Sequence, residues 1–141
     1  MLTYVRKIAV LAMLVCVCAA ILPSCKGGID RDEAKEVINE FFSCIVAEDF
    51  EGAQGYLHPE RPAELKPFLE SVEADTGVDF QEGIIIERYS NFSSAYYDSS
   101  VGGSTYELTM ITSVGESKVK FTIELVQNDN GYGIYNLDID T

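Results

Sequence analysis

The sequence predicts an α+β domain, with N-terminal helices packed on one face of a four-stranded antiparallel sheet. Apolar residues recur at helical spacing up to Gly77 and alternate with polar residues in the runs that follow. Such alternation is typical of antiparallel strands that have one face in solvent. Helices that precede the strands as a group indicate the α+β class.

The first predicted helix spans residues 31–47. Asp30, with Glu33 three residues later, forms a variant of the capping box that opens helices. The apolar stripe of this helix needs a sheet or another helix to cover it. The stripe consists of Ala34, Val37, Ile38, Phe41, Phe42 and Ile45.

A second, shorter helix is expected through residues 53–57. Glu48 and Asp49 can cap its beginning, and His58 with Pro59 ends it.

A third helix is expected from Pro62 to Gly77. Proline is tolerated in a first helical turn, and glycine is typical of the position just after a helix. Pro67 lies near the beginning of the apolar stripe, so this helix is expected to start later than Pro62 or to be kinked. The stripe consists of Leu65, Phe68, Leu69 and Val72.

Four strands are predicted in the second half of the chain. They cover residues 83–97, 104–114, 118–126 and 132–140. The Asn130-Gly131 pair between the last two is typical of a type I′ hairpin turn.

Length, charge and histidine content limit the possible functions. A chain of 141 residues holds one ordinary domain, and its formal charge of −13 gives no basic face for nucleic acid. No nucleic-acid partner is therefore expected. The single histidine, His58, excludes His-rich metal centres, and no H-E-x-x-H, G-x-S-x-G or paired C-x-x-C motif occurs, so no metal site or cofactor is expected either.

The first 24 residues have the features of an export signal. Arg6 and Lys7 precede an apolar run over residues 8–22. That run is shorter than the roughly 20 residues that a transmembrane helix needs.

The sequence Leu22-Pro23-Ser24-Cys25 resembles the lipobox of bacterial lipoproteins. The resemblance implies cleavage before Cys25, which then carries the lipid anchor, with residues 25–29 as the lipidated cysteine and tether. Lys26 after the cysteine, in place of the aspartate of inner-membrane retention, favours the outer membrane. Cleavage would change the formal charge from −13 to −15, because it removes Arg6 and Lys7 and no acid.

Cysteine usage agrees with this interpretation. Cys16 and Cys18 would leave with the leader, and Cys44 would be the one thiol of the mature domain, so no internal disulfide is possible. A lone cysteine of this kind is expected to be buried as a small apolar residue.

Residues 30–141 resemble the nuclear-transport-factor-two-like fold of the cystatin-like superfamily. The resemblance rests on residues 37–42 (VINEFF), 47–53 (AEDFEGA) and 56–60 (YLHPE). It implies a curved sheet wrapped over the helices and does not specify an activity.

The candidate ligand-binding residues are His58, Tyr96, Tyr106 and Tyr135. His58 could act as a general base oriented by Glu60, but a structural role at a helix end is the favoured hypothesis. Tyrosines are common in strands and also at binding surfaces, so both roles remain open.

The sequence therefore predicts a lipid-anchored envelope protein that binds a small ligand or a protein partner and is not an enzyme. Its open sheet face is the expected binding surface. One alternative is a small pocket enzyme of the ketosteroid-isomerase-like type. Another is a structural subunit of an envelope assembly.

Overall fold

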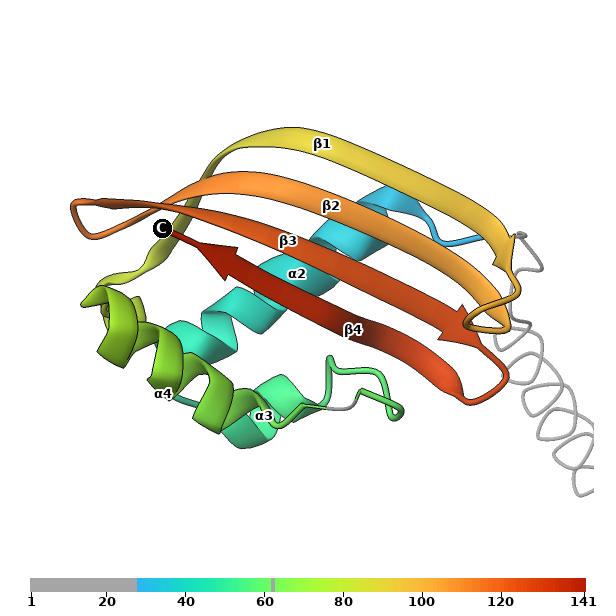
Figure 1. Ribbon diagram of the computed structural model, residues 1–141, viewed down its shortest axis with the longest axis horizontal. Helices are drawn as coiled ribbons and strands as arrows, with labels where there is room; N and C mark the ends of the chain where they lie inside the picture. The colour runs from blue at the N-terminus through green and yellow to red at the C-terminus, as the bar shows by residue number, and fades with distance from the viewer. Residues whose placement is uncertain (1–27, 62) are drawn as a thin grey trace, which may run out of the picture.

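The computed structural model describes residues 28–61 and 63–141. The predicted leader, Cys25 and Pro62 lie outside the described residues. Four strands form one curved antiparallel layer, and the helices lie on its concave side (Figure 1). The α+β prediction is confirmed at this level.

Helix α2 (Arg31–Val46) begins where the capping pattern predicts. The Asp30 carboxylate accepts hydrogen bonds from the backbone N–H groups of Asp32 and Glu33. These are two of the N–H groups that a helix start leaves without partners. Buried α2 residues such as Ile38, Phe41 and Phe42 face the sheet.

Helix α3 (Phe50–Gln54) ends three residues earlier than predicted. Asp49 caps it as expected, with its carboxylate accepting from Gly52 N–H. The expected extension to Leu57 is wrong, because Leu57 forms a parallel bridge with Ile134 of the last strand. The flanking bonds run from His58 N–H to Ile134 C=O and from Ile134 N–H to Tyr56 C=O. Extended pairing with a distant strand replaces the last helical turn.

Helix α4 (Leu65–Thr76) starts later than Pro62, as the second proline predicts. Pro67 is its third residue, inside the first turn, where the missing N–H has no helical partner to lose. Gly77 ends it in the left-handed conformation, with φ of 74°. A short 3₁₀ turn, η1 (Phe80–Glu82), then leads into the sheet.

The sheet is a simple meander of β1 (Ile84–Asp98), β2 (Gly103–Val114), β3 (Ser117–Asn128) and β4 (Gly131–Asp140). These bounds agree with the predicted strands to within one or two residues. In β2 every second residue from Ser104 to Val114 is buried, so one face meets the helices. Strand β1 is an edge strand with three register irregularities against β2, and most of its residues are exposed.

The β3–β4 turn differs from the prediction. Asn128 pairs with Gly131, so Asp129 and Asn130 form the two-residue loop. Neither has a positive φ, which a type I′ turn requires of both. Asn at the first position and Gly at the fourth are instead preferences of a type I turn. The Asn128 side chain fixes this turn by accepting from Asn130 N–H.

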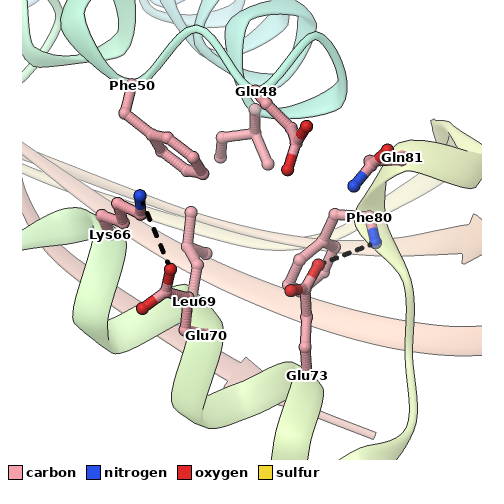
Figure 2. A pocket seen from close by; sticks show the side chains of 9 residues that line it. Glu48, Phe50, Lys66, Leu69, Glu70, Glu73, Phe80 and Gln81 are labelled. Carbon is pink, nitrogen blue, oxygen red and sulfur yellow. Dashed lines mark hydrogen bonds and ion pairs between the residues drawn. The ribbon is translucent and has the colours of Figure 1, made fainter.

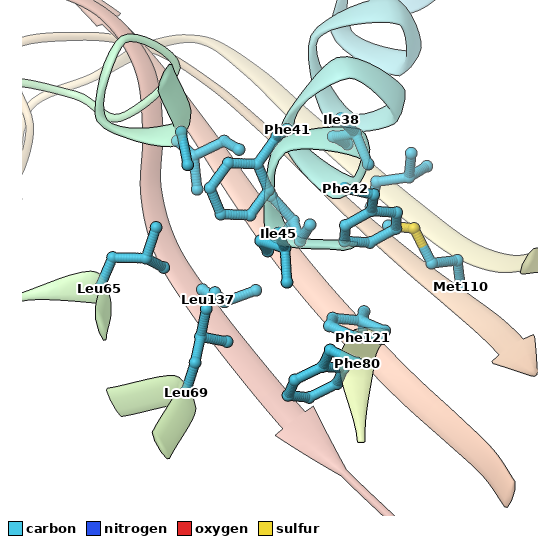
Figure 3. Close-up of a cluster of buried hydrophobic side chains, with 14 of the residues drawn as sticks. Ile38, Phe41, Phe42, Ile45, Leu65, Leu69, Phe80, Met110, Phe121 and Leu137 are labelled. Atoms are coloured by element: carbon cyan, nitrogen blue, oxygen red, sulfur yellow. The ribbon is translucent and has the colours of Figure 1, made fainter. Parts of the chain in front are cut away.

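The hydrophobic core lies between the helices and the concave face of the sheet. Figure 3 shows Phe42 of α2 and Phe80 of η1 against Phe121 of β3, with ring centroids 4.8 Å and 6.1 Å from Phe121. Leu65 and Leu69 of α4 are buried in the same cluster. Each such side chain contributes about 1.5–3 kcal/mol by burial, which fixes the helices on the sheet.

Candidate functional site

The four predicted candidates separate into two groups. His58 and Tyr135 lie together beside β4, with ring centroids 5.7 Å apart in an edge-to-face arrangement. Tyr96 and Tyr106 lie on β1 and β2 and line a different hollow. The structure does not bring His58 into a single site with Tyr96 and Tyr106.

His58 is 2% exposed, and both of its ring nitrogens have partners. The Glu60 backbone N–H donates to Nδ1 at 3.1 Å, so Nε2 carries the proton and donates to Asn128 Oδ1, also at 3.1 Å. The ring thus accepts from a backbone N–H, and it lies four residues beyond the end of α3, not at the helix end that the sequence predicted. Its geometry matches the structural role.

The Glu60 carboxylate does not hydrogen-bond to the His58 ring. Its oxygens accept instead from Asn128 Nδ2 at 3.0 Å and from Asn130 Nδ2 at 2.8 Å. Asn128 Nδ2 also donates to the backbone oxygen of Val101. This network joins the loop after α3 to the β1–β2 and β3–β4 turns, and sequence reasoning missed it.

A hollow of ≈ 230 Å³ beside His58 is bordered by Arg61. The Arg61 guanidinium donates to the backbone oxygens of Tyr135 and Ala63, both at 3.1 Å. Burial lowers the pKa of this guanidinium. Arg61 therefore has a structural role, because its side chain connects the loop after α3 to strand β4.

A second hollow, of ≈ 120 Å³, lies between the α2–α3 connection and α4 (Figure 2). Side chains of Glu48 and Phe50 face those of α4 across it. Its charged groups are engaged: Lys66 Nζ lies 3.7 Å from Glu70 Oε1, and Glu73 Oε1 accepts from Phe80 N–H at 3.2 Å. Glu48 has φ of 55°, a left-handed conformation that is uncommon outside glycine.

The third hollow, of ≈ 200 Å³, lies between the start of α2 and the sheet, and we call it the tyrosine hollow. Gly28 and Ile29 form one side of this hollow. The aromatic residues Phe92, Tyr96 and Tyr106 form the other. The residues that line it are Gly28, Ile29, Arg31, Phe92, Ser94, Ala95, Tyr96, Thr105 and Tyr106. The Arg31 guanidinium lies over the Phe92 ring, 4.9 Å from its centroid.

Tyr106 gives this hollow its polar feature. The residue is 4% exposed, and its hydroxyl has no hydrogen-bond partner among the described residues. A buried hydroxyl without a partner destabilises a fold by about 1–3 kcal/mol, so such groups are rare in native structures. Tyr96 beside it is 74% exposed, and Ser104 Oγ donates to its backbone oxygen.

Two further tyrosines on the same face of the sheet, Tyr132 and Tyr89, have side chains with a raised pKa. Burial raises the pKa of Tyr132 to about 12, and Glu33 and Asp30 reinforce the shift. The Tyr132 hydroxyl is the second buried hydroxyl without a partner in the described chain. Burial, together with Tyr106, raises the pKa of Tyr89, whose ring lies 4.7 Å from Lys35 Nζ.

The tyrosine hollow is suited to binding. Its walls are apolar or aromatic and its polar groups are neutral hydroxyls, and among the described residues Arg31 is the single charged residue that lines it. Within the same described residues, no carboxylate or imidazole lines it. A flat apolar group with one hydrogen-bonding atom fits this chemistry.

The remaining observations on the described residues concern metal ligands, the free cysteine and membrane-spanning helices. Within residues 28–61 and 63–141, no three His, Cys, Asp or Glu side chains are grouped to hold a metal ion. Cys44 is a free thiol that packs partly buried against the core, and burial, then Asp49 and Glu40, raise its pKa. In the same part of the chain, no helix combines the length and the hydropathy needed to cross a bilayer.

Comparison of the chain with protein-family models, with curated proteins and with solved structures gives no match.

Proposed function

We propose that the chain is a bacterial envelope lipoprotein, anchored through Cys25, whose domain binds a small ligand in the tyrosine hollow without chemical conversion. The domain belongs, in this proposal, to the nuclear-transport-factor-two-like group. Three helices on the concave face of a curved four-stranded sheet support that assignment. Export to the outer membrane follows from the leader and from Lys26.

The unpartnered Tyr106 hydroxyl is the observation that carries the binding proposal. The residue is one of those that line the hollow, which has exposed aromatic rings on one side, and its hydroxyl is buried. A ligand with a carbonyl or hydroxyl oxygen would supply the missing hydrogen bond. Aromatic rings such as Phe92 and Tyr96 would pack on its apolar part.

The ketosteroid-isomerase-like alternative has less support. It needs an ionisable group beside the tyrosines of the hollow, whereas His58 lies beside Tyr135 in the other group, with both ring nitrogens engaged. The structural-subunit alternative predicts stable co-purifying partners, and the binding proposal does not require them.

The lipid anchor is tested by metabolic labelling with a fatty acid. The full-length chain should incorporate the label, and Cys25→Ala should not. Cys44→Ala is the matched control and should label like the wild type. Continued labelling of Cys25→Ala would overturn the anchor.

The hollow is tested with a pair of probes that differ in one oxygen. We expect the full-length chain to bind a naphthyl methyl ketone more tightly than ethylnaphthalene, in which CH₂ replaces the carbonyl, by about tenfold, the effect of roughly one net hydrogen bond. Tyr106→Phe should abolish this preference and leave the fold intact. Tyr135→Phe, in the other group, should keep it. A wild-type chain with no preference for the ketone would contradict the proposal.

A further inference from the structure

Exposed aromatic side chains are concentrated at the C-terminal end of β1. Phe92, Tyr96 and Tyr97 are 58%, 74% and 75% exposed, and together we call them the aromatic rim. Three large apolar side chains this exposed within six residues of one edge strand are typical of an interaction surface.

The described chain begins against this rim. A Cβ placed on Gly28 would lie 2.5 Å from Tyr96 Cδ1, so the Gly28 backbone lies directly against the tyrosine ring. Ile29 and Arg31 border the tyrosine hollow together with Phe92 and Tyr96. Figure 1 shows the start of α2 beneath the same end of β1.

Covalent geometry keeps the rim close to Cys25. Two residues, Lys26 and Gly27, separate Cys25 from Gly28. The three steps from Cys25 to Gly28 span at most about 10 Å when fully extended. A diacylglycerol on Cys25 places that residue at the boundary between lipid headgroups and acyl chains. Tyr96, in contact with Gly28, is then within reach of the same boundary.

We propose that the aromatic rim inserts into the interface of the bilayer that holds Cys25, so that the tyrosine hollow opens at the membrane surface. The inference rests on the proposed lipid anchor. Tyrosine and phenylalanine suit this position because aromatic rings partition to the headgroup level.

Charge distribution makes the rim the contact point. The outer face of the sheet carries Glu107 and Glu124 on paired positions, and the chain as a whole is strongly acidic, so anionic lipid repels most of the surface. At the rim, Arg31 lies over Phe92 and offers a cation toward lipid phosphates.

The chain contains no tryptophan, so one introduced tryptophan reports on its own surroundings. The experiment uses the full-length lipidated chain in vesicles of phosphatidylethanolamine and phosphatidylglycerol, with and without bromine in the lipid acyl chains. Phe92→Trp and Tyr97→Trp place the reporter on the rim. Ile85→Trp is the matched control, because Ile85 is 67% exposed at the opposite end of β1.

We expect brominated lipid to remove most of the emission from the two rim reporters and to leave that of Ile85→Trp unchanged. Equal quenching at all three positions, or at none, would overturn the proposal while the protein still floats with the vesicles. Blue-shifted rim emission that bromine does not quench would also overturn it, in favour of contact between two copies. Loss of flotation by the wild type would instead show that the anchor itself is wrong, and the inference with it.

Discussion

The buried His58 ring provides hydrogen-bond partners for Glu60 N–H and Asn128 Oδ1. His58→Ala should lower the free energy of unfolding by about 2–3 kcal/mol, because Glu60 N–H loses its acceptor, Asn128 Oδ1 loses a donor and a cavity remains. Urea titration measures the change. The exposed neighbour Gln54 is the control, and Gln54→Ala should change stability by less than about 0.5 kcal/mol. An unchanged midpoint for His58→Ala would contradict the structural role.

Tyr132 links stability to alkaline pH. Its folded pKa of about 12 lies above the unfolded value of about 10, so the folded state holds this proton more tightly. The contribution of the protonated Tyr132 side chain to the free energy of unfolding is therefore fully present below about pH 10. It is lost as the pH rises from about 10 to 12. Urea titrations at pH 9 and 11 should reveal the loss.

Tyr132→Phe should flatten this alkaline decline. It should not destabilise the domain at neutral pH, because the hydroxyl it removes has no partner in the described chain. Tyr97→Phe, at an exposed position, is the control and should keep the decline. An identical decline in Tyr132→Phe would show that another group is responsible.

The candidate residues could be named from the sequence, but their partners could not. His58 and Asn128 are 70 positions apart, and no local pattern predicts that an imidazole and a turn amide will share a hydrogen bond. The unpartnered state of Tyr106 likewise depends on what β1, β3 and α2 place around it. Strand periodicity locates Tyr106 on the inner face and says nothing about its hydroxyl.

At the scale of elements, the crossing of the α3 loop over β4 depends on Gly133. A Cβ there would lie 2.7 Å from both His58 N and Leu57 C, which is closer than real Cβ contacts. Gly133→Ala should therefore destabilise the domain by about 2 kcal/mol or more, through the parallel bridge to Ile134.

Gly102→Ala is the comparison variant, because it introduces backbone strain without a close contact to another segment. Gly102 has φ of 71° and open space around its Cα, so alanine there should cost only about 1 kcal/mol. Chemical denaturation of both variants gives the comparison. Equal effects would mean that the close approach at Gly133 is easily relieved.

The sequence predicts which segments are helices and which are strands, because the spacing of apolar residues determines this locally. It does not predict every residue at which a helix or turn ends. Asp30 and Asp49 cap helices through hydrogen bonds within three residues, which the sequence displays directly. Helix α3 ends early because β4, far along the chain, pairs with Leu57. The β3–β4 turn is not type I′ because Asn128 side-chain bonds compete with the intrinsic preference of Asn-Gly.

At the scale of the whole molecule, self-repulsion among acids should make stability depend on salt. The formal charge is −13, and Glu107 and Glu124 occupy directly paired positions on β2 and β3. Burial, then Glu107 and Asp98, raise the pKa of Glu124. Like charges at paired positions destabilise a sheet.

Raising the ionic strength from about 0.01 to 0.15 M shortens the screening length from about 30 to 8 Å. The thermal midpoint of the full-length chain in nonionic detergent should therefore rise by about 2–5 °C. The increase should shrink near pH 4.5, where carboxylates begin to take up protons. A midpoint that falls with salt would show that favourable ion pairs outweigh the repulsion.

The order of the elements also determines when the domain can fold during synthesis. Each hairpin of the meander joins neighbours in sequence, so the sheet can assemble from adjacent segments. Helix α2 is made first, but its apolar stripe is covered by a core that includes Leu137 of the last strand. Until β4 has emerged, the core is incomplete and the nascent chain exposes Phe41 and Phe42, which favours aggregation.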